Sequence, residues 1–186
     1  MSIKYIAING PSGSGRSTIA RELCSRLKMP DAPPRAVMDS LAAPLKHYIA
    51  TLLGDRYNDM DKRRPRAELF GYSVSDFIQF EAGVASARYG DDVFAKSLVH
   101  RCLRLLPLPR FVIVDDLTTE AEYLVLNGQP GGVRMIHVRG RGDKNRESDY
   151  VHFSSETVFW NDGEMATLWA RVDRLAGQIL RSRYDQ

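Results

Sequence analysis

Residues 10–17 read Gly10-Pro11-Ser12-Gly13-Ser14-Gly15-Arg16-Ser17. They match the phosphate-loop pattern G-x-x-x-x-G-K-[ST] at every defined position except one, because Arg16 stands where lysine is usual. The glycines let the backbone curl so that successive N–H groups point at phosphate oxygens, and the helix that follows adds its positive end. We therefore expect a nucleoside triphosphate to bind here, at Gly10, Ser12, Gly13, Ser14, Gly15, Arg16, Ser17 and Thr18.

Arg16 and Ser17 carry the chemistry expected of this loop. Arginine keeps the positive charge of the usual lysine, although its planar fork is bulkier than an ammonium group, so we expect Arg16 to act on the transferred phosphoryl group. The hydroxyl of Ser17 is a candidate ligand of Mg²⁺, and Thr18 is a weaker candidate for a phosphate contact. The alternative is a glycine-rich turn without a ligand, which explains neither the glycine spacing nor Ser17 after a cation.

A second acidic element follows the apolar run Phe111 to Val114. An acid at the end of such a strand can hold the water shell of Mg²⁺ in phosphate-loop proteins. Asp115 is our candidate for this role, and Asp116 is the alternative; an acid at a strand end is also a common helix cap.

Strand patterns alternate with helix patterns along the chain. Short apolar runs predict strands, and apolar residues at helical spacing predict amphipathic helices. This alternation predicts an α/β fold with a parallel sheet. The expected strands are Ile3–Asn9, Ala36–Asp39, Phe111–Asp116, Val133–Val138 and Thr157–Trp160; the expected helices are about Arg16–Leu27, Leu41–Leu53, Ser73–Ala87, Asp91–Leu106 and Thr119–Leu126, with a long one after Gly163.

The composition is that of an ordinary globular protein. The 186 residues suit one domain, with 44% hydrophobic and 26% charged residues and a net charge of +3. No apolar run approaches the roughly 20 residues that span a bilayer, so we expect no membrane partner. Cys24 and Cys102 fall on apolar helix faces without metal spacing, which favours buried thiols in a reducing cytoplasm.

Further segments carry a resemblance to a known family. Leu41–Lys46 resembles a [FL]-A-x-P-[LI]-K segment, Tyr72–Gln79 and Gly90–Phe94 resemble S-V-R-x-x-x-Q and D-x-[YW] elements, and Asn161–Gly163 resembles an N-D-G turn. With the phosphate loop, these segments make the chain similar to the phage deoxynucleoside monophosphate kinases, the T-even type included, and more distantly to animal phosphomevalonate kinase.

The resemblance implies a fold and a set of site residues. It implies a nucleoside-monophosphate-kinase-like, five-stranded parallel P-loop NTPase sheet flanked by helices, in one domain over residues 1–186, with ATP as donor. It places a helical acceptor region at about residues 40–106, a lid at about 139–152 whose Arg139, Arg141 or Arg146 would neutralise developing charge, and Asn161 near the adenine. The acceptor candidates are Lys46, which either contacts phosphate or lies along its helix, Gln79, and Arg88, which could replace a lost clamp.

Two arginines of the family pattern are missing. Ser75 stands in the S-V-R element and Leu117 in the D-x-R element, whereas Asp39 is an acid that the pattern does not contain. A monophosphate acceptor needs cationic clamps, which are hard to replace, but needs no base. An alcohol needs no clamp but needs a carboxylate to take its proton. Asp39 is therefore our candidate general base; the alternative is that it caps the next helix.

Two enzyme hypotheses and one non-enzymatic hypothesis follow. We narrowly favour a kinase that phosphorylates the hydroxyl of 5-hydroxymethyluracil in DNA, a reaction known for phage P-loop kinases related to the monophosphate kinases. Residues Lys62–Arg66 would then contact the DNA backbone, unless this basic run is simply a solvated face. The close alternative is a deoxynucleoside monophosphate kinase that makes diphosphates. The remote alternative, suggested by Arg16, is a nucleotide-binding module without catalysis.

Overall fold

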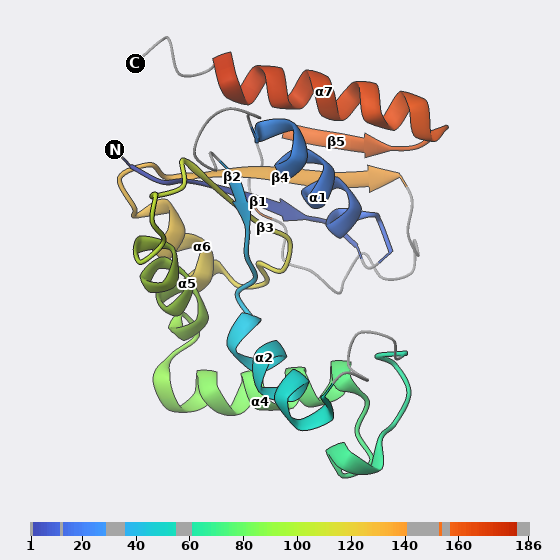
Figure 1. Ribbon diagram of the computed structural model, residues 1–186, viewed down its shortest axis with the longest axis vertical. Helices are drawn as coiled ribbons and strands as arrows, with labels where there is room; N and C mark the ends of the chain where they lie inside the picture. The colour runs from blue at the N-terminus through green and yellow to red at the C-terminus, as the bar shows by residue number, and fades with distance from the viewer. Residues whose placement is uncertain are drawn as a thin grey trace.

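One parallel sheet organises the protein (Figure 1). The computed structural model describes residues 2–11, 13–28, 36–54, 61–140, 153 and 157–181. Within them the sheet has five strands in the order β2-β3-β1-β4-β5, and every neighbouring pair is parallel. The predicted α/β fold is confirmed. The strands are β1 (Lys4–Asn9), β2 (Ala36–Met38), β3 (Phe111–Val114), β4 (Val133–Gly140) and β5 (Thr157–Asn161).

Helices α1 (Arg16–Leu27) and α7 (Met165–Arg181) cover one face of this sheet. Successive strand residues point to opposite faces, so Ile6 and Ile8 of the central strand β1 face these two helices. The apolar residues of α7 recur every three or four positions and form a stripe against α1 and the sheet. The buried members of that stripe are Leu168, Val172, Leu175, Ala176 and Ile179.

Helices α5 (Val93–Leu103) and α6 (Glu120–Asn127) cover the opposite face. The alternate β1 residues Tyr5 and Ala7 pack there against Leu98 and Cys102 of α5 and Leu126 of α6. Three layers of helix, sheet and helix therefore bury the strands on both sides, which explains why the strands read as continuous apolar runs.

A helical arm extends beyond the end of β2. Helices α2 (Ala43–Leu53) and α4 (Val74–Tyr89), with the 3₁₀ turn η1 (Ala67–Leu69), lie outside the three layers (Figure 1). They bury a small core of their own, formed by Ile49, Leu53, Leu69, Val74 and Phe77. The region expected at about 40–106 thus divides into this arm (residues 43–53 and 61–89) and α5, which packs on the sheet.

Both cysteines are buried and free, as the sequence predicted. Burial raises the pKa of the Cys102 thiol to about 12 and also raises the pKa of Cys24. Neither thiol is therefore prepared to react as a thiolate. None of the described helices has the length and apolar character needed to cross a membrane.

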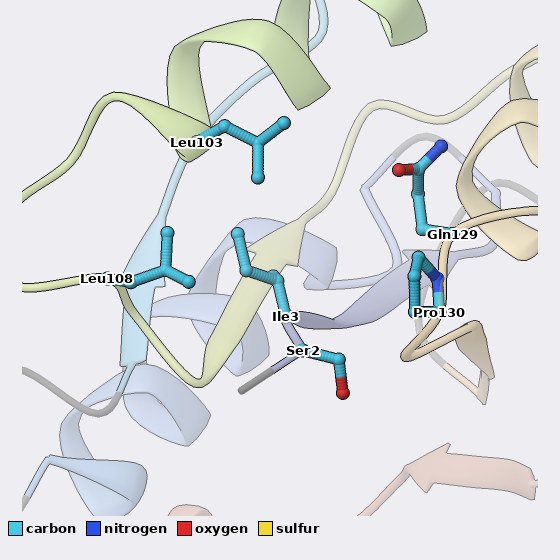
Figure 2. Close-up of a pocket in the computed structure, with 6 residues that line it drawn as sticks. All are labelled: Ser2, Ile3, Leu103, Leu108, Gln129 and Pro130. Carbon is cyan, nitrogen blue, oxygen red and sulfur yellow. The ribbon is translucent and has the colours of Figure 1, made fainter.

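A hollow of about 350 Å³ lies at the amino ends of the strands (Figure 2). Ser2 and Ile3 line it just before β1, Leu103 is the last residue of α5 and Leu108 follows that helix, and Gln129 and Pro130 precede β4. The phosphate loop follows the carboxyl end of β1, so it lies at the opposite end of the strands. The hollow is therefore separate from the candidate active site.

Candidate active site

The phosphate loop connects the central strand β1 to α1 and is shaped by its glycines. Gly10 has a φ of 146°, and a Cβ there would lie 2.5 Å from the carbonyl oxygen of Val138 in β4. Gly15 has a φ of 93° and stands immediately before α1; a Cβ there would collide with the side-chain amide of Asn161. Both positions require glycine, because larger residues rarely adopt this backbone conformation and would meet these neighbours.

The start of α1 is open to an anion. Among the described residues no side chain caps this helix end, and its first turn contains no acidic residue. Side chains do cap α4 (Ser73) and α6 (Thr119 with Glu122), whereas, within the described chain, α2 and α5 lack a side-chain cap, as α1 does. The first backbone N–H groups of a helix have no acceptor within the helix and carry its positive dipole end. Arg16, Ser17 and Thr18 form the first turn of α1. These residues, which the sequence predicted to bind the nucleoside triphosphate, therefore lie where a phosphate would bind.

Asn161 supports the loop from the end of β5. Its side chain is buried, and its Nδ2 donates a hydrogen bond to the carbonyl oxygen of Ser14 over 2.6 Å. The Ser14 hydroxyl is enclosed and has no hydrogen-bond partner among the described residues. Such groups are rare in folded proteins. The unpartnered hydroxyl and the uncapped helix end together fit a loop built around a phosphate. The sequence placed Asn161 near the adenine; the described contact is with the loop itself.

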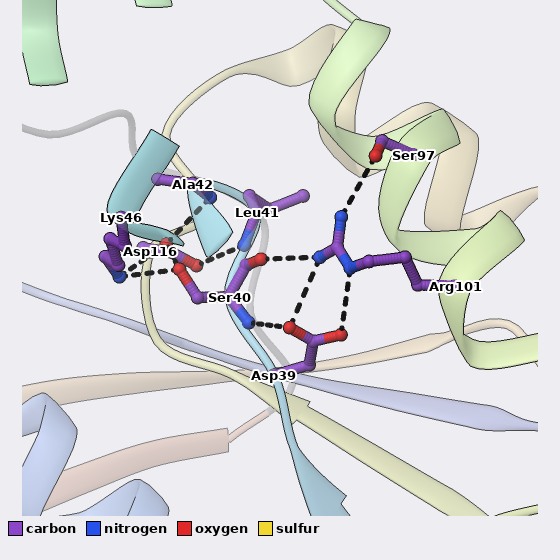
Figure 3. Close-up of polar contacts among 8 residues, drawn as sticks. All are labelled: Asp39, Ser40, Leu41, Ala42, Lys46, Ser97, Arg101 and Asp116. Carbon is purple, nitrogen blue, oxygen red and sulfur yellow. Dashed lines mark hydrogen bonds and ion pairs between the residues drawn. The ribbon is translucent and has the colours of Figure 1, made fainter. Parts of the chain in front are cut away.

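The two acids after β3 have different surroundings. Asp116 accepts hydrogen bonds from the backbone N–H groups of Leu41 (2.9 Å) and Ala42 (3.3 Å) and from the hydroxyl of Ser40 (Figure 3). It therefore holds the turn that precedes α2. Asp115 is half-buried, and none of the hydrogen bonds or ion pairs among the described residues uses its carboxylate. Asp115 is thus the acid available to a metal ion.

Strand register supports this assignment of Asp115. Ala7 of β1 lies beside Val114 of β3, so Asp115 lies next to the end of β1, where the phosphate loop begins. No group of three or more His, Cys, Asp or Glu side chains in the described part of the chain could hold a metal ion alone. This suits Mg²⁺, which is commonly held by one or two side chains together with nucleotide phosphates and water. Ser17 and Asp115 fit that role.

Asp39 follows β2 and is held by Arg101 of α5 (Figure 3). Arg101 Nη2 lies 3.2 Å from Asp39 Oδ1, and Arg101 Nε lies 3.4 Å from Asp39 Oδ2. Nη2 also donates to the carbonyl oxygen of Ser40 (2.8 Å), and Nη1 donates to the hydroxyl of Ser97 (3.0 Å). The backbone N–H of Ser40 donates to Asp39 Oδ1 over 2.7 Å. The carboxylate is therefore fixed in one orientation.

The sequence did not identify Arg101 as a site residue. One signal was present, because Arg101 stands beside Cys102 and three residues after Leu98, both of which are buried. A cation next to the apolar stripe of a helix points along the protein surface or into a polar site, and only the packing of α5 on the sheet decides between them.

The remaining acceptor candidates separate into two groups. Lys46 lies in the Asp116 cluster, with its Nζ 2.5 Å from the Ser40 hydroxyl and 3.3 Å from Asp116 Oδ2. Gln79 and Arg88 are exposed on α4, where the Arg88 guanidinium lies 5.5 Å from the ring centre of Tyr89. In the described structure, no hydrogen bond or ion pair joins Gln79 or Arg88 to Asp39 or to its partner Arg101.

The expected lid is described only at its first two residues. Arg139 and Gly140 form the end of β4, and both are exposed. Ser12 of the phosphate loop, Arg141, Arg146 and residues 141–152 lie outside the described residues.

Several solved kinase structures are distantly similar to this chain. No protein-family model and no curated protein sequence matches the chain. Solved structures that resemble it include a gluconokinase from Sinorhizobium meliloti 1021 (13% identity, 97% of each chain, TM-score 0.47). They also include a shikimate kinase from Acinetobacter baumannii in complex with shikimate (13% identity, 98% of this chain and 93% of that one, TM-score 0.47). A thymidylate kinase from Ehrlichia chaffeensis is similar as well (14% identity, 98% and 89%, TM-score 0.37).

With TM-scores below 0.5 and identities of 13% and 14%, these similarities carry no conclusion about this chain. The parallel sheet in the order β2-β3-β1-β4-β5, with the phosphate loop between the central strand and α1, defines a P-loop α/β fold of the nucleotide-kinase type. The similar structures named above are kinases with different substrates, and none is specific to the phage kinases that the sequence resembles.

Proposed function

We propose that this chain is an ATP- and Mg²⁺-dependent phosphotransferase that transfers the γ-phosphoryl group to a hydroxyl group, with 5-hydroxymethyluracil in DNA as the leading acceptor. The observation that carries this proposal is the Asp39 carboxylate, oriented by Arg101 and Ser40 at the carboxyl end of β2. The carboxyl ends of parallel strands meet at one edge of the sheet, and the phosphate loop follows β1 at that same edge.

The donor side rests on the phosphate loop. The N–H groups at the start of α1 would bind phosphate oxygens, and Arg16 would neutralise charge on the transferred group. Ser17 and Asp115 would hold Mg²⁺, which supplies positive charge to the triphosphate when it is bound. Arg139 and the lid arginine Arg141 remain candidates for the same electrostatic task.

The described acceptor side carries no net positive charge. Asp39 and Asp116 balance Arg101 and Lys46, which leaves a formal charge of zero among these four groups. Arg101 has four hydrogen bonds to protein atoms, so most of its donors are already used. A phosphate dianion would meet no net positive charge in this arrangement, whereas a neutral alcohol needs none. The charge balance therefore favours a hydroxyl acceptor.

Asp39 would receive the proton of that hydroxyl. Its Oδ2 carries one long hydrogen bond of 3.4 Å and keeps lone-pair capacity for a further donor. As the acceptor oxygen bonds to the γ-phosphorus, its proton would pass to Asp39 and ADP would leave with the electron pair of the broken P–O bond. Phosphoryl transfer depends mainly on positioning and electrostatics, so the fixed orientation of the carboxylate matters as much as its basicity.

A deoxynucleoside monophosphate kinase is the second candidate. Two cations favour it: the Lys46 ammonium, which lies 3.3 Å from Asp116 after β3, and the exposed Arg88 on α4. Both could hold a substrate phosphate. Gln79, exposed on the same helix, would contact either acceptor. A module that binds nucleotide without catalysis is the third reading, and any transfer to an acceptor would exclude it.

A radiolabel transfer assay tests the proposal. γ-Labelled ATP with Mg²⁺ is offered to DNA containing 5-hydroxymethyluracil, to the same DNA with thymine, and to the four deoxynucleoside monophosphates. Label on the hydroxymethyl DNA alone is the expected result, because thymine differs only in lacking the hydroxyl. Label confined to a monophosphate would establish the second candidate instead. Asp39→Asn should remove the transfer, and the exposed Asp91→Asn should not.

A further inference from the structure

Three aromatic side chains project from the helical arm into solvent. Phe70 is 86% exposed, Phe80 is 55% exposed and Tyr72 is 45% exposed. The rings of Tyr72 and Phe80 are stacked, with their centres 6.0 Å apart and an angle of 22° between their planes. Large rings exposed together mark an interaction site more often than isolated apolar residues do.

These rings belong to the same piece of structure as the basic run. The backbone N–H of Arg66 donates to the carbonyl oxygen of Tyr72 (3.0 Å), and the N–H of Gly71 donates to the carbonyl oxygen of Arg66 (2.8 Å). The N–H of Ser75, in the first turn of α4, donates to the carbonyl oxygen of Lys62 (3.2 Å). Residues 61–72 therefore form a loop that its own backbone hydrogen bonds hold together. A further hydrogen bond joins this loop to α4, which carries Phe80.

Phe70 is held outward at a conformational cost. Its φ is 54°, in the left-handed region that a bulky residue rarely adopts, and it is the one non-glycine residue with positive φ in the described chain. Because the ring is almost fully exposed, no packing within the protein compensates for this conformation. Phe70 ends the 3₁₀ turn η1, and its backbone N–H donates to the carbonyl oxygen of Ala67. Backbone strain of this kind is concentrated at active sites and ligand clamps.

The surrounding charge is positive. Residues 61–72 contain four cations (Lys62, Arg63, Arg64 and Arg66) and two carboxylates (Asp61 and Glu68), a net charge of +2. Arg64 pairs with Asp61 over 3.5 Å, but both side chains are more than half exposed, so the pair is weak and a phosphate could compete for it. Aromatic rings beside exposed cations match a chain of alternating bases and phosphates.

We propose that residues 61–72 together with Phe80 form a surface for single-stranded nucleic acid, on which Phe70, Tyr72 and Phe80 stack with bases and the cations contact phosphates. The inference rests on the proposed DNA acceptor, and deepens it by naming the form of the DNA. Base faces are free to stack on a protein only in a single strand or after flipping from a duplex. Asp39 precedes α2 of the same arm, so the candidate base and this surface are connected through one helical unit.

Fluorescence anisotropy with a labelled oligothymidylate, without ATP, tests this surface. The Phe70→Leu/Phe80→Leu variant keeps apolar bulk but loses the rings, and we expect roughly tenfold weaker binding or more with an unchanged salt dependence. The Lys62→Ala/Arg63→Ala/Arg64→Ala variant should lower the slope of log affinity against log salt by about 2. Leu124→Ala, an exposed apolar position on α6, is the control and should bind as the wild type does.

Three results would overturn the inference. The ring variant could bind the single strand as tightly as the wild type. A matched duplex could bind as tightly as the single strand, which would indicate a purely electrostatic surface. Finally, the wild type could fail to bind the oligonucleotide and instead self-associate as its concentration rises. If the ring variant abolished that self-association, the rings would be assigned to contact with a second copy of the chain. Thermal unfolding of each variant checks that the arm is folded.

Failure of this inference is separable from failure of the proposed function. Transfer of label to hydroxymethyl DNA with unaltered oligonucleotide binding by the ring variant would remove only the stacking surface. Loss of oligonucleotide binding in the ring variant, with label transferred to monophosphates alone, would remove only the DNA acceptor.

Discussion

Arg101 and Asp39 face each other between α5 and the end of β2, with Arg101 Nη2 3.2 Å from Asp39 Oδ1. The same guanidinium binds the Ser40 carbonyl and the Ser97 hydroxyl, so it links α5 to the segment that leads into the helical arm. The two residues are 62 positions apart in the chain. The orientation of the candidate base therefore depends on a helix that contributes no other side chain to the proposed chemistry.

Replacing Arg101 should reduce transfer without reducing ATP binding. In Arg101→Leu the Asp39 carboxylate loses its fixed orientation, and we expect kcat to fall by about tenfold or more, since misplaced groups are costly in catalysis. Arg101→Lys keeps the charge but not the fork and should retain part of the rate. Steady-state kinetics with the acceptor and an ATP titration measure both effects. An unchanged kcat in Arg101→Leu would remove the positioning role.

The two acids after β3 should behave in opposite ways. Asp116→Ala removes the carboxylate that accepts hydrogen bonds from the turn before α2, and we expect a loss of about 1–2 kcal/mol in the free energy of unfolding. Asp115→Asn should change stability by less than about 0.5 kcal/mol, because its carboxylate has no described partner. It should, however, weaken ATP binding in the presence of Mg²⁺ and not in its absence. Urea unfolding and nucleotide titrations separate the two, and the reverse pattern would exchange their roles.

Arg16 should be replaceable by lysine but not by alanine. A charged hydrogen bond to phosphate contributes about 1.5–3 kcal/mol, so Arg16→Ala should weaken ATP binding by about tenfold to a hundredfold. Arg16→Lys restores the usual residue of the motif and should bind ATP within a few-fold of the wild type. Isothermal titration measures both, with the exposed Arg21→Ala on the same helix as control. Equal affinity of the alanine variant would place Arg16 outside the triphosphate site.

Glu122 should make stability depend on pH. Burial raises the pKa of its carboxyl above the ordinary 4.5, although the N–H groups of Thr118 and Thr119 partly oppose the shift. The folded chain therefore keeps this proton to a higher pH than the unfolded chain, so the contribution of Glu122 to stability falls as the pH rises above about 4.5. Glu122→Gln removes the titration and should flatten that decline.

Unfolding free energies of the wild type and the Glu122→Gln variant, measured at several pH values from about 4 to 7, give this difference directly. A gap that narrows as the pH falls is the expected result, since both side chains are then neutral. Parallel curves would show that folding does not shift the pKa of Glu122.

The sequence alone determined the fold class and the phosphate loop. The predicted helix Arg16–Leu27 has those bounds in the structure, and the five expected strands all occur. These features are local, because apolar spacing and glycine placement act over a few residues. Where signals were weak the ends moved: the helix expected to reach Leu106 ends at Leu103. Leu105 and Leu106 continue the apolar pattern up to Pro107, so no residue of the sequence marks the earlier end.

Only the tertiary structure decided how the acceptor side is assembled. The sequence left Asp115 and Asp116 as alternatives for the metal and did not identify Arg101. In the structure Asp116 holds the turn at Leu41, 75 positions earlier in the chain, and the packing of α5 on the sheet brings Arg101 to Asp39. Such pairings depend on which helix lies over which strand end, and that arrangement is fixed by burial of the whole apolar core, so no short stretch of sequence contains it.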